Sequence, residues 1–92
     1  MALTFDPDKR AWTLRERSLD FADAAQVLDD SSGITVADER FNYGETRFQT
    51  KGRLAGRLVM VVWTRRGSDR HIISMRKCNE REQRSFRHRL ES

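Results

Sequence analysis

The feature that most constrains the fold of this 92-residue chain is a run of six apolar residues, Leu58–Trp63 (LVMVVW). Turn-forming residues bracket the run around Gly56 and Gly67, which suits a β-strand of ordinary length. A strand that is apolar at every position, and not only at every second one, is typical of a central strand covered on both faces. We therefore expect a sheet with this strand in its interior.

Alternating apolar and polar residues predict the other strands of this sheet. Residues 34–37 and 47–51 have the period of two that strands show, and residues 71–75 follow the apolar run across an Arg-Gly-Ser-Asp turn. Four successive strands with short connections favour an antiparallel meander. The sequence also leaves open an extra N-terminal strand over residues 2–5.

Two helices are predicted before the strands. Asp6 can cap a helix that starts at Pro7 and is expected to reach about Arg17, with three apolar residues facing inward: Ala11, Trp12 and Leu14. Asp20 can cap a second helix, whose buried stripe consists of Phe21, Ala24, Ala25 and Leu28.

A last helix is predicted after the strand that ends near Met75. Asn79 and Glu82 have the spacing of a capping box, and the only large apolar residues beyond them are Phe86 and Leu90, a narrow stripe suited to docking a partner. We expect one α+β domain over residues 1–92. It should contain two N-terminal helices, a four-stranded antiparallel sheet and a C-terminal helix, with the helices on one side of the sheet.

Charge divides the chain into two halves. Residues 1–46 carry five Lys and Arg against ten Asp and Glu, a net charge of −5, while residues 47–92 carry thirteen against four, a net charge of +9. Such a basic half is typical of proteins that bind nucleic acid or an acidic protein. The simpler alternative is that these charges only keep the surface soluble.

The side-chain alternation of strands predicts where the basic residues gather. By parity, Arg70, Ile72, Ser74 and Arg76 share one face of the last strand, and His71, Ile73 and Met75 share the other. If the apolar residues rest on the helices, a cationic open face results, lined by Arg47, Lys51, Arg70 and Arg76. His71 is then expected to be a core histidine and not a catalytic base.

Several classes of site and location are not indicated by the sequence. No apolar run has the length of a membrane span and no signal peptide is evident, so a cytoplasmic protein without a membrane partner is expected. The single cysteine, Cys78, rules out an intrachain disulfide, and no metal site is expected from the two histidines, His71 and His88. No serine lies in a nucleophile elbow and no glycine-rich phosphate loop is present.

Several segments, in order along nearly the whole chain, resemble the BrnT toxins of bacterial type II toxin–antitoxin modules. They are FDPDK at 5–9, SLDFADAAQVLDD at 18–30, Glu45 and Arg47 before Gly52, VVWT at 61–64, and RHIISMRK at 70–77 followed by NEREQRSF. There are two departures. Phe5 stands where the family often has tryptophan, and the family's common Lys-His-Gly turn is replaced by Glu16, Arg17 and Ser18. Arg17 keeps the positive charge of that turn but cannot serve as a proton acceptor.

The resemblance implies a RelE-like fold and cleavage of RNA without the ribosome and with little sequence preference. It also implies inhibition of translation, and neutralisation by a BrnA-type antitoxin with a ribbon-helix-helix DNA-binding domain. DNA would then be contacted only indirectly, through the complex with the antitoxin.

Cleavage of RNA without a metal cofactor can use the ribose 2′-hydroxyl as nucleophile, which requires a proton acceptor and cations around the phosphate. Arg76 and Arg47 are the candidates for stabilising the transition state. Glu45 is either a base or a group that orients Arg47. Four further cations are candidates for positioning RNA: Lys51, Arg70, Lys9 and Arg17.

Two alternatives to a ribonuclease remain open at this point. In the first, the basic face holds nucleic acid or an acidic partner without cleaving it, and the protein is a non-catalytic binding module. Alternatively, the chain is a structural subunit that is stable only with its antitoxin, docked through Phe86 and Leu90 on the last helix.

Overall fold

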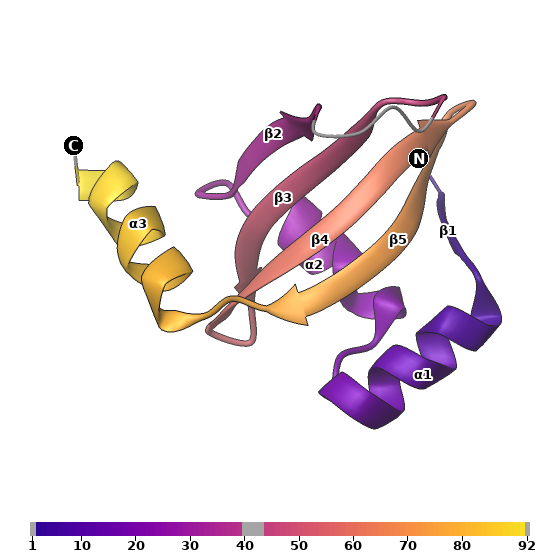
Figure 1. The fold of residues 1–92 in the computed structure, drawn as a ribbon, viewed down its shortest axis with the longest axis horizontal. Helices are drawn as coiled ribbons and strands as arrows, with labels where there is room; N and C mark the ends of the chain where they lie inside the picture. The colour runs from indigo at the N-terminus through magenta and orange to yellow at the C-terminus, as the bar shows by residue number, and fades with distance from the viewer. Residues whose placement is uncertain (1, 40–43, 92) are drawn as a thin grey trace.

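The structure is a computed structural model that describes residues 2–39 and 44–91 (Figure 1). It is an α+β fold with these elements in chain order: β1 (Leu3–Phe5), α1 (Pro7–Arg17), the 3-10 turn η1 (Phe21–Asp23), α2 (Ala24–Leu28), β2 (Ile34–Asp38), β3 (Arg47–Leu54), β4 (Arg57–Arg66), β5 (Asp69–Lys77) and α3 (Glu80–Glu91). Within these residues, no helix is long and apolar enough to cross a membrane.

The five strands form one mixed sheet in the order β1-β5-β4-β3-β2. The antiparallel meander of β2 to β5 is as expected, and the optional N-terminal strand exists. It pairs with β5 in parallel, with Phe5 opposite Ile72, so the sheet is mixed and has five strands, whereas the sequence predicted four antiparallel strands. The parallel pairing is possible because α1 and the meander separate β1 from β5.

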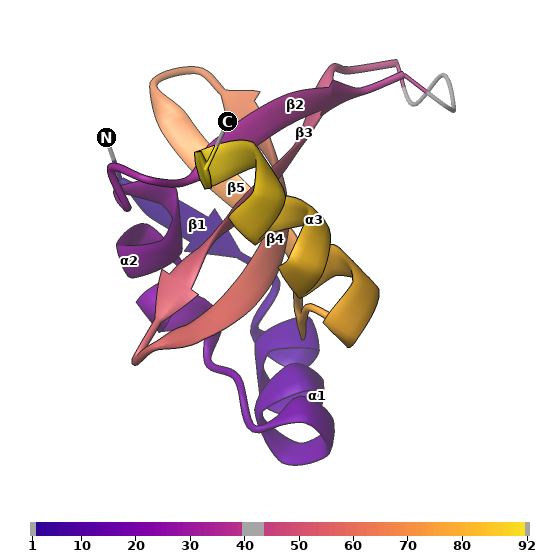
Figure 2. The ribbon, with the colours of Figure 1, turned by 90° about the vertical axis from the view of Figure 1, so that its left-hand side faces the viewer.

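Strand β4 is covered on both faces, as its apolar run predicts. Val59, Val61 and Trp63 face the core shared with η1 and α2. Leu58 and Met60 point the opposite way, into a second cluster that includes Cys78 and Phe86. Figure 2 shows α2 and α3 on opposite sides of the sheet. The expectation that all helices lie on one side is therefore wrong, because the second face of β4 also needs an apolar cover.

The N-terminal helices begin where their caps predict. The Asp6 carboxylate accepts a hydrogen bond from the Asp8 backbone N–H at 2.8 Å, and the Asp20 carboxylate accepts one from Ala22 N–H at 2.9 Å. The second helix divides into η1 and the short α2. Helix α2 lies so close to β3 that a Cβ on Gly52 would come within 2.4 Å of the Val27 carbonyl oxygen, so only glycine fits there.

The inward face of α1 is not the one that the sequence predicts. Trp12 and Leu14 are 45% and 48% exposed, while the neighbouring Thr13 is buried at 3%. The helix meets the rest of the protein beside β5 and η1, at the margin of the sheet (Figure 1). It therefore buries only a narrow stripe, and its largest apolar residues stay on the surface.

A β-bulge in β5 changes the predicted parity of that strand. Val62 pairs with Ser74, but the next residue of β4, Trp63, pairs with Ile72, which leaves Ile73 as the extra residue. Ile72 and Met75 are consequently both fully buried in the same core. The expectation that Ser74 shares a face with Ile72 is wrong. The extra residue reverses the side of the sheet on which each residue of the N-terminal half of β5 lies.

Candidate functional site

The sheet face opposite α1 and α2, called here the open face, carries three rows of side chains, polar and apolar, that follow the strand register. One row contains Thr4, His71, Thr64, Arg47 and Asp38. The next contains Ser74, Val62, Gln49 and Val36, and the third contains Arg76, Met60, Lys51 and Ile34. Three of the four cations predicted from parity, Arg47, Lys51 and Arg76, therefore share the open face.

Arg70 is the exception to that prediction. The bulge places it on the helix-covered face, opposite Arg65 of β4, where its Nη1 donates to Asp29 Oδ1 at the end of α2 at 3.2 Å. The expectation that Arg70 lines the open face is therefore wrong. Arg70 links β5 to α2 instead.

Arg76 marks one end of the open face, here called the Arg76 end. Its Nη1 and Nη2 donate to Oε1 and Oε2 of Glu82 on α3, both at 2.7 Å, and Nη2 also lies 3.6 Å from the Met60 sulfur. This bidentate pair raises the pKa of Arg76 and lowers the pKa of Glu82 to about 2, chiefly through the hydrogen bonds between them.

Glu82 has a second role as the capping residue of α3. Its Oε1 accepts from the Asn79 backbone N–H at 2.9 Å, and Asn79 Oδ1 accepts from the Glu82 N–H at 2.8 Å. This is the capping box that the sequence predicts. Because the same carboxylate also binds Arg76, the first turn of α3 is fastened directly to the candidate phosphate-binding arginine.

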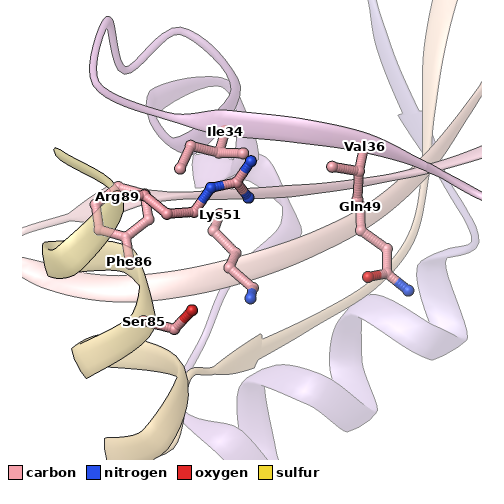
Figure 3. Close-up of a pocket in the computed structure, with 7 residues that line it drawn as sticks. All are labelled: Ile34, Val36, Gln49, Lys51, Ser85, Phe86 and Arg89. Atoms are coloured by element: carbon pink, nitrogen blue, oxygen red, sulfur yellow. The ribbon is translucent and has the colours of Figure 1, made fainter. Parts of the chain in front are cut away.

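Helix α3 covers the Arg76 end and holds to the sheet mainly through Phe86. That side chain is 2% exposed and packs in the cluster of Leu58, Met60 and Cys78, while Leu90 is 46% exposed. With α3 in this position, Leu90 is accessible for docking and Phe86 is not. A small cavity of about 60 Å³ lies beside the helix. Figure 3 shows the residues that line it: Ile34, Val36, Gln49, Lys51, Ser85, Phe86 and Arg89.

The opposite end of the open face, here called the His71 end, contains a carboxylate shared between two arginines. Glu45 Oε1 lies 3.8 Å from Arg47 Nε and 3.6 Å from Arg66 Nη2. Arg47 and Arg76 are two strands and four residues apart in register, which separates their backbones by roughly 16 Å. The two ends can therefore contact different parts of one extended ligand.

His71 lies on the open face at this end, between the edge strand β1 and Thr64, and sequence reasoning missed it. The bulge that moves Arg70 away brings His71 here, and no residue type in the sequence signals that bulge. The histidine Nδ1 and the Thr4 hydroxyl are 2.8 Å apart, so the Thr4 hydroxyl orients the ring.

Burial lowers the pKa of His71. The charges of Arg66 and Lys9 act in the same direction, whereas Glu45 and Asp6 oppose them. The imidazole is consequently neutral at neutral pH and can accept a proton.

The remaining predicted RNA contacts, Lys9 and Arg17, lie beside the sheet at α1. Arg17 Nη1 donates to the Met75 carbonyl oxygen at 2.8 Å, and its guanidinium lies 5.0 Å from the ring centre of Trp12. Both basic residues line a groove between α1 and β5. In residues 2–39 and 44–91, no three His, Cys, Asp or Glu side chains are grouped so that they could hold a metal ion.

Comparison with known proteins gives one family match. A family model described as "Ribonuclease toxin, BrnT, of type II toxin-antitoxin system" matches residues 5–82. The match includes both ends of the open face and stops before Phe86. No curated protein sequence matches the chain.

Proposed function

The chain belongs to the BrnT family of ribonuclease toxins of type II toxin–antitoxin systems, and on that premise we propose that its open face cleaves RNA without a metal ion. Family membership implies an RNA substrate and an antitoxin partner. The observation that carries the proposal is that β3 and β5 place cations and a neutral histidine on one face of the sheet: Arg47, Lys51, Arg76 and His71.

The proposed reaction uses the ribose 2′-hydroxyl of the substrate as nucleophile. With its Nδ1 proton donated to Thr4, His71 has a lone pair on Nε2 that accepts the 2′-hydroxyl proton. The 2′-oxygen then bonds to phosphorus, and the bond from phosphorus to the 5′-oxygen breaks. The 5′-oxygen takes up a proton from water and the protonated His71 returns its proton to solvent, so the products are a 2′,3′-cyclic phosphate and a 5′-hydroxyl.

The cations stabilise the charge that develops on the phosphate. Arg47 has the shortest path to a phosphate near His71, because Thr64 alone lies between them in the row. Glu45 contacts both Arg47 and Arg66, so we assign it to positioning Arg47 and not to proton transfer. Arg76 and Lys51 hold a neighbouring part of the RNA strand. For Arg76 this requires that a phosphate displace Glu82 from its two hydrogen bonds with the guanidinium.

The wider roles follow from this activity. RNA cleavage would inhibit translation and would take place in the cytoplasm. A BrnA-type antitoxin with a ribbon-helix-helix domain would neutralise the chain, and DNA would be contacted only through that complex. Leu90 is the proposed docking residue on α3, since its side chain is exposed. The mixed sheet with helices on both faces is the arrangement to be tested against the RelE-like fold.

A second candidate function is a binding module that holds RNA without cleaving it. The replacement of the family's common Lys-His-Gly turn by Glu16, Arg17 and Ser18 favours it, because the histidine of that turn is missing here. Such a module would bind RNA with an affinity that falls steeply as salt is added, and would leave the RNA intact.

One assay separates the two functions. Purified protein is incubated with RNA in EDTA, and the wild type is compared with Arg47→Ala and with the control Arg15→Ala, which changes an exposed arginine of α1. Loss of a transition-state cation should lower the cleavage rate by about 100-fold or more in Arg47→Ala, and Arg15→Ala should cleave normally. Intact RNA with the folded wild type, together with salt-dependent binding, would establish the binding module instead.

A further inference from the structure

The groove between α1 and β5 is a mainly apolar recess that the proposed reaction does not use. It has a volume of about 440 Å³, and its lining includes Lys9, Trp12, Arg17, Ile73 and Ser74. Trp12 is 45% exposed there, which is unusual for a tryptophan in a chain with so small a core. The groove therefore presents a large aromatic surface to solvent.

The shape of the groove follows from how β1 and β5 pair. Strand β1 ends at Phe5, opposite Ile72, so the rest of β5 has no strand neighbour on that side. The bulged residue Ile73 lies in this gap and lines the groove. Arg17 binds the Met75 carbonyl oxygen at the far end of the gap, which fixes α1 beside the strand without closing the groove.

The charges around the groove favour an anionic ligand with a flat apolar part. Lys9 and Arg17 flank Trp12, and Asp8 is the acidic residue in the lining. Arg17 also borders a second recess, which it shares with the basic Arg76 and Lys77 and the acidic Glu16. Mainly basic side chains therefore lie between the groove and the Arg76 end of the open face. Ser74 lines the groove and also belongs to the second row of the open face, with Val62 and Gln49.

We propose that this groove binds an unpaired base of the substrate RNA, stacked on Trp12, with Lys9 at the adjoining phosphate. The proposal rests on the ribonuclease function and extends it, since it gives the RNA strand a binding subsite outside the reacting centre. Bases of single-stranded RNA stack on exposed aromatic rings, and flanking cations hold their phosphates.

Binding of a short 2′-O-methyl RNA strand tests the proposal, because this probe lacks the nucleophilic hydroxyl and is not cleaved. The chain has two tryptophans, and Trp63 is only 7% exposed, so the probe should quench the fluorescence of Trp12. Trp12→Ala should weaken binding roughly 5- to 100-fold, measured by anisotropy of the labelled strand, and Trp12→Phe should recover part of the loss. Leu14→Ala, an equally exposed site on α1, should bind normally.

The outcomes distinguish this proposal from the ribonuclease function. If wild type cleaves RNA while Trp12→Ala binds and cleaves as well as wild type, the groove is not a base-binding subsite and the ribonuclease function stands. If Trp12→Ala binds RNA normally but loses its antitoxin, the groove is a protein-docking surface and the proposal is overturned. If the folded wild type neither binds nor cleaves RNA, both fail together.

Discussion

The two ends of the open face use the same residue types in different ways. At the Arg76 end, a guanidinium and a carboxylate meet in two 2.7 Å hydrogen bonds beneath α3. At the His71 end, Glu45 lies 3.6 and 3.8 Å from two arginines, and the histidine is held by a single neutral hydroxyl. The charged side chains at the Arg76 end bind each other tightly, whereas those at the His71 end are farther apart and interact more weakly.

This difference indicates a division of labour along the substrate. A short bidentate pair neutralises both partners, so RNA must displace Glu82 before it can use Arg76. The His71 end needs no such exchange to receive a ribose. We infer that proton transfer belongs to the His71 end, whereas the Arg76 end contributes to holding the strand and responds to the position of α3.

The largest expected effect comes from removing the proton acceptor. His71→Gln should lower the RNA cleavage rate by about 100-fold or more, because a positioned general base contributes 10²- to 10⁴-fold. In wild type the rate should fall as pH drops through the pKa of His71, which lies below 6.5. The variant should lose this dependence in a pH–rate profile recorded in EDTA.

The control for that variant is His88→Gln, which changes an exposed histidine of α3. It should leave both the rate and the pH profile unchanged. A His71→Gln protein that keeps the wild-type acid limb would contradict the assignment. The acid limb would then not report on His71, whose surrounding charged groups are Asp6, Lys9, Glu45 and Arg66.

A smaller effect, on RNA affinity, is expected from removing the ion pair between Arg76 and Glu82. Glu82→Gln removes the carboxylate charge but keeps the capping box, since glutamine caps helices in the same way. RNA should bind roughly fivefold more tightly, because a competing ion pair worth about 1 kcal/mol is lost. The same loss should lower the melting temperature by about 4–8 °C in a domain of this size.

The pH dependence of the melting temperature tests whether the Glu82 carboxylate stabilises the fold. The pKa of Glu82 lies near 2 in the folded protein against an ordinary value of 4.5, so its stabilising effect is complete above 4.5 and disappears as pH falls toward about 2. The difference in melting temperature between wild type and Glu82→Gln should shrink over that range. Glu80→Gln, which also removes a carboxylate from the first turn of α3, is the matched control. Unchanged RNA affinity in Glu82→Gln would mean that Arg76 does not contact the strand.

Local sequence signals predicted the elements of the fold well, because each depends on residues close in the chain. The Asp6 and Asn79 caps set the starts of α1 and α3, and the apolar run Leu58–Trp63 identified the central strand. The capping-box spacing even pointed to Glu82. Its bond to Arg76 was not evident, because that contact depends on which face α3 covers.

The candidate site was predicted only in part, because it depends on register. One extra residue, Ile73, exchanges the faces of Arg70 and His71, and any single residue of a regular strand pattern can bulge in this way. Trp12 was assigned to the core since its position fits an amphipathic helix. The structure leaves it exposed because α1 meets only the margin of the sheet.

The smallest expected effect concerns the hydroxyl that orients His71. Thr4→Val keeps the shape of the side chain and removes the hydrogen bond to Nδ1, which should lower the cleavage rate by roughly 2- to 12-fold, the equivalent of about 0.5–1.5 kcal/mol. A merely structural role would leave the pH profile in place, whereas loss of the partner that sets the tautomer should also shift its acid limb. Thr4→Ser restores the hydroxyl and should recover both rate and profile. If Thr4→Val and Thr4→Ser behave alike, the His71 end is positioned by packing, and the contrast with the hydrogen-bonded Arg76 end would be lost.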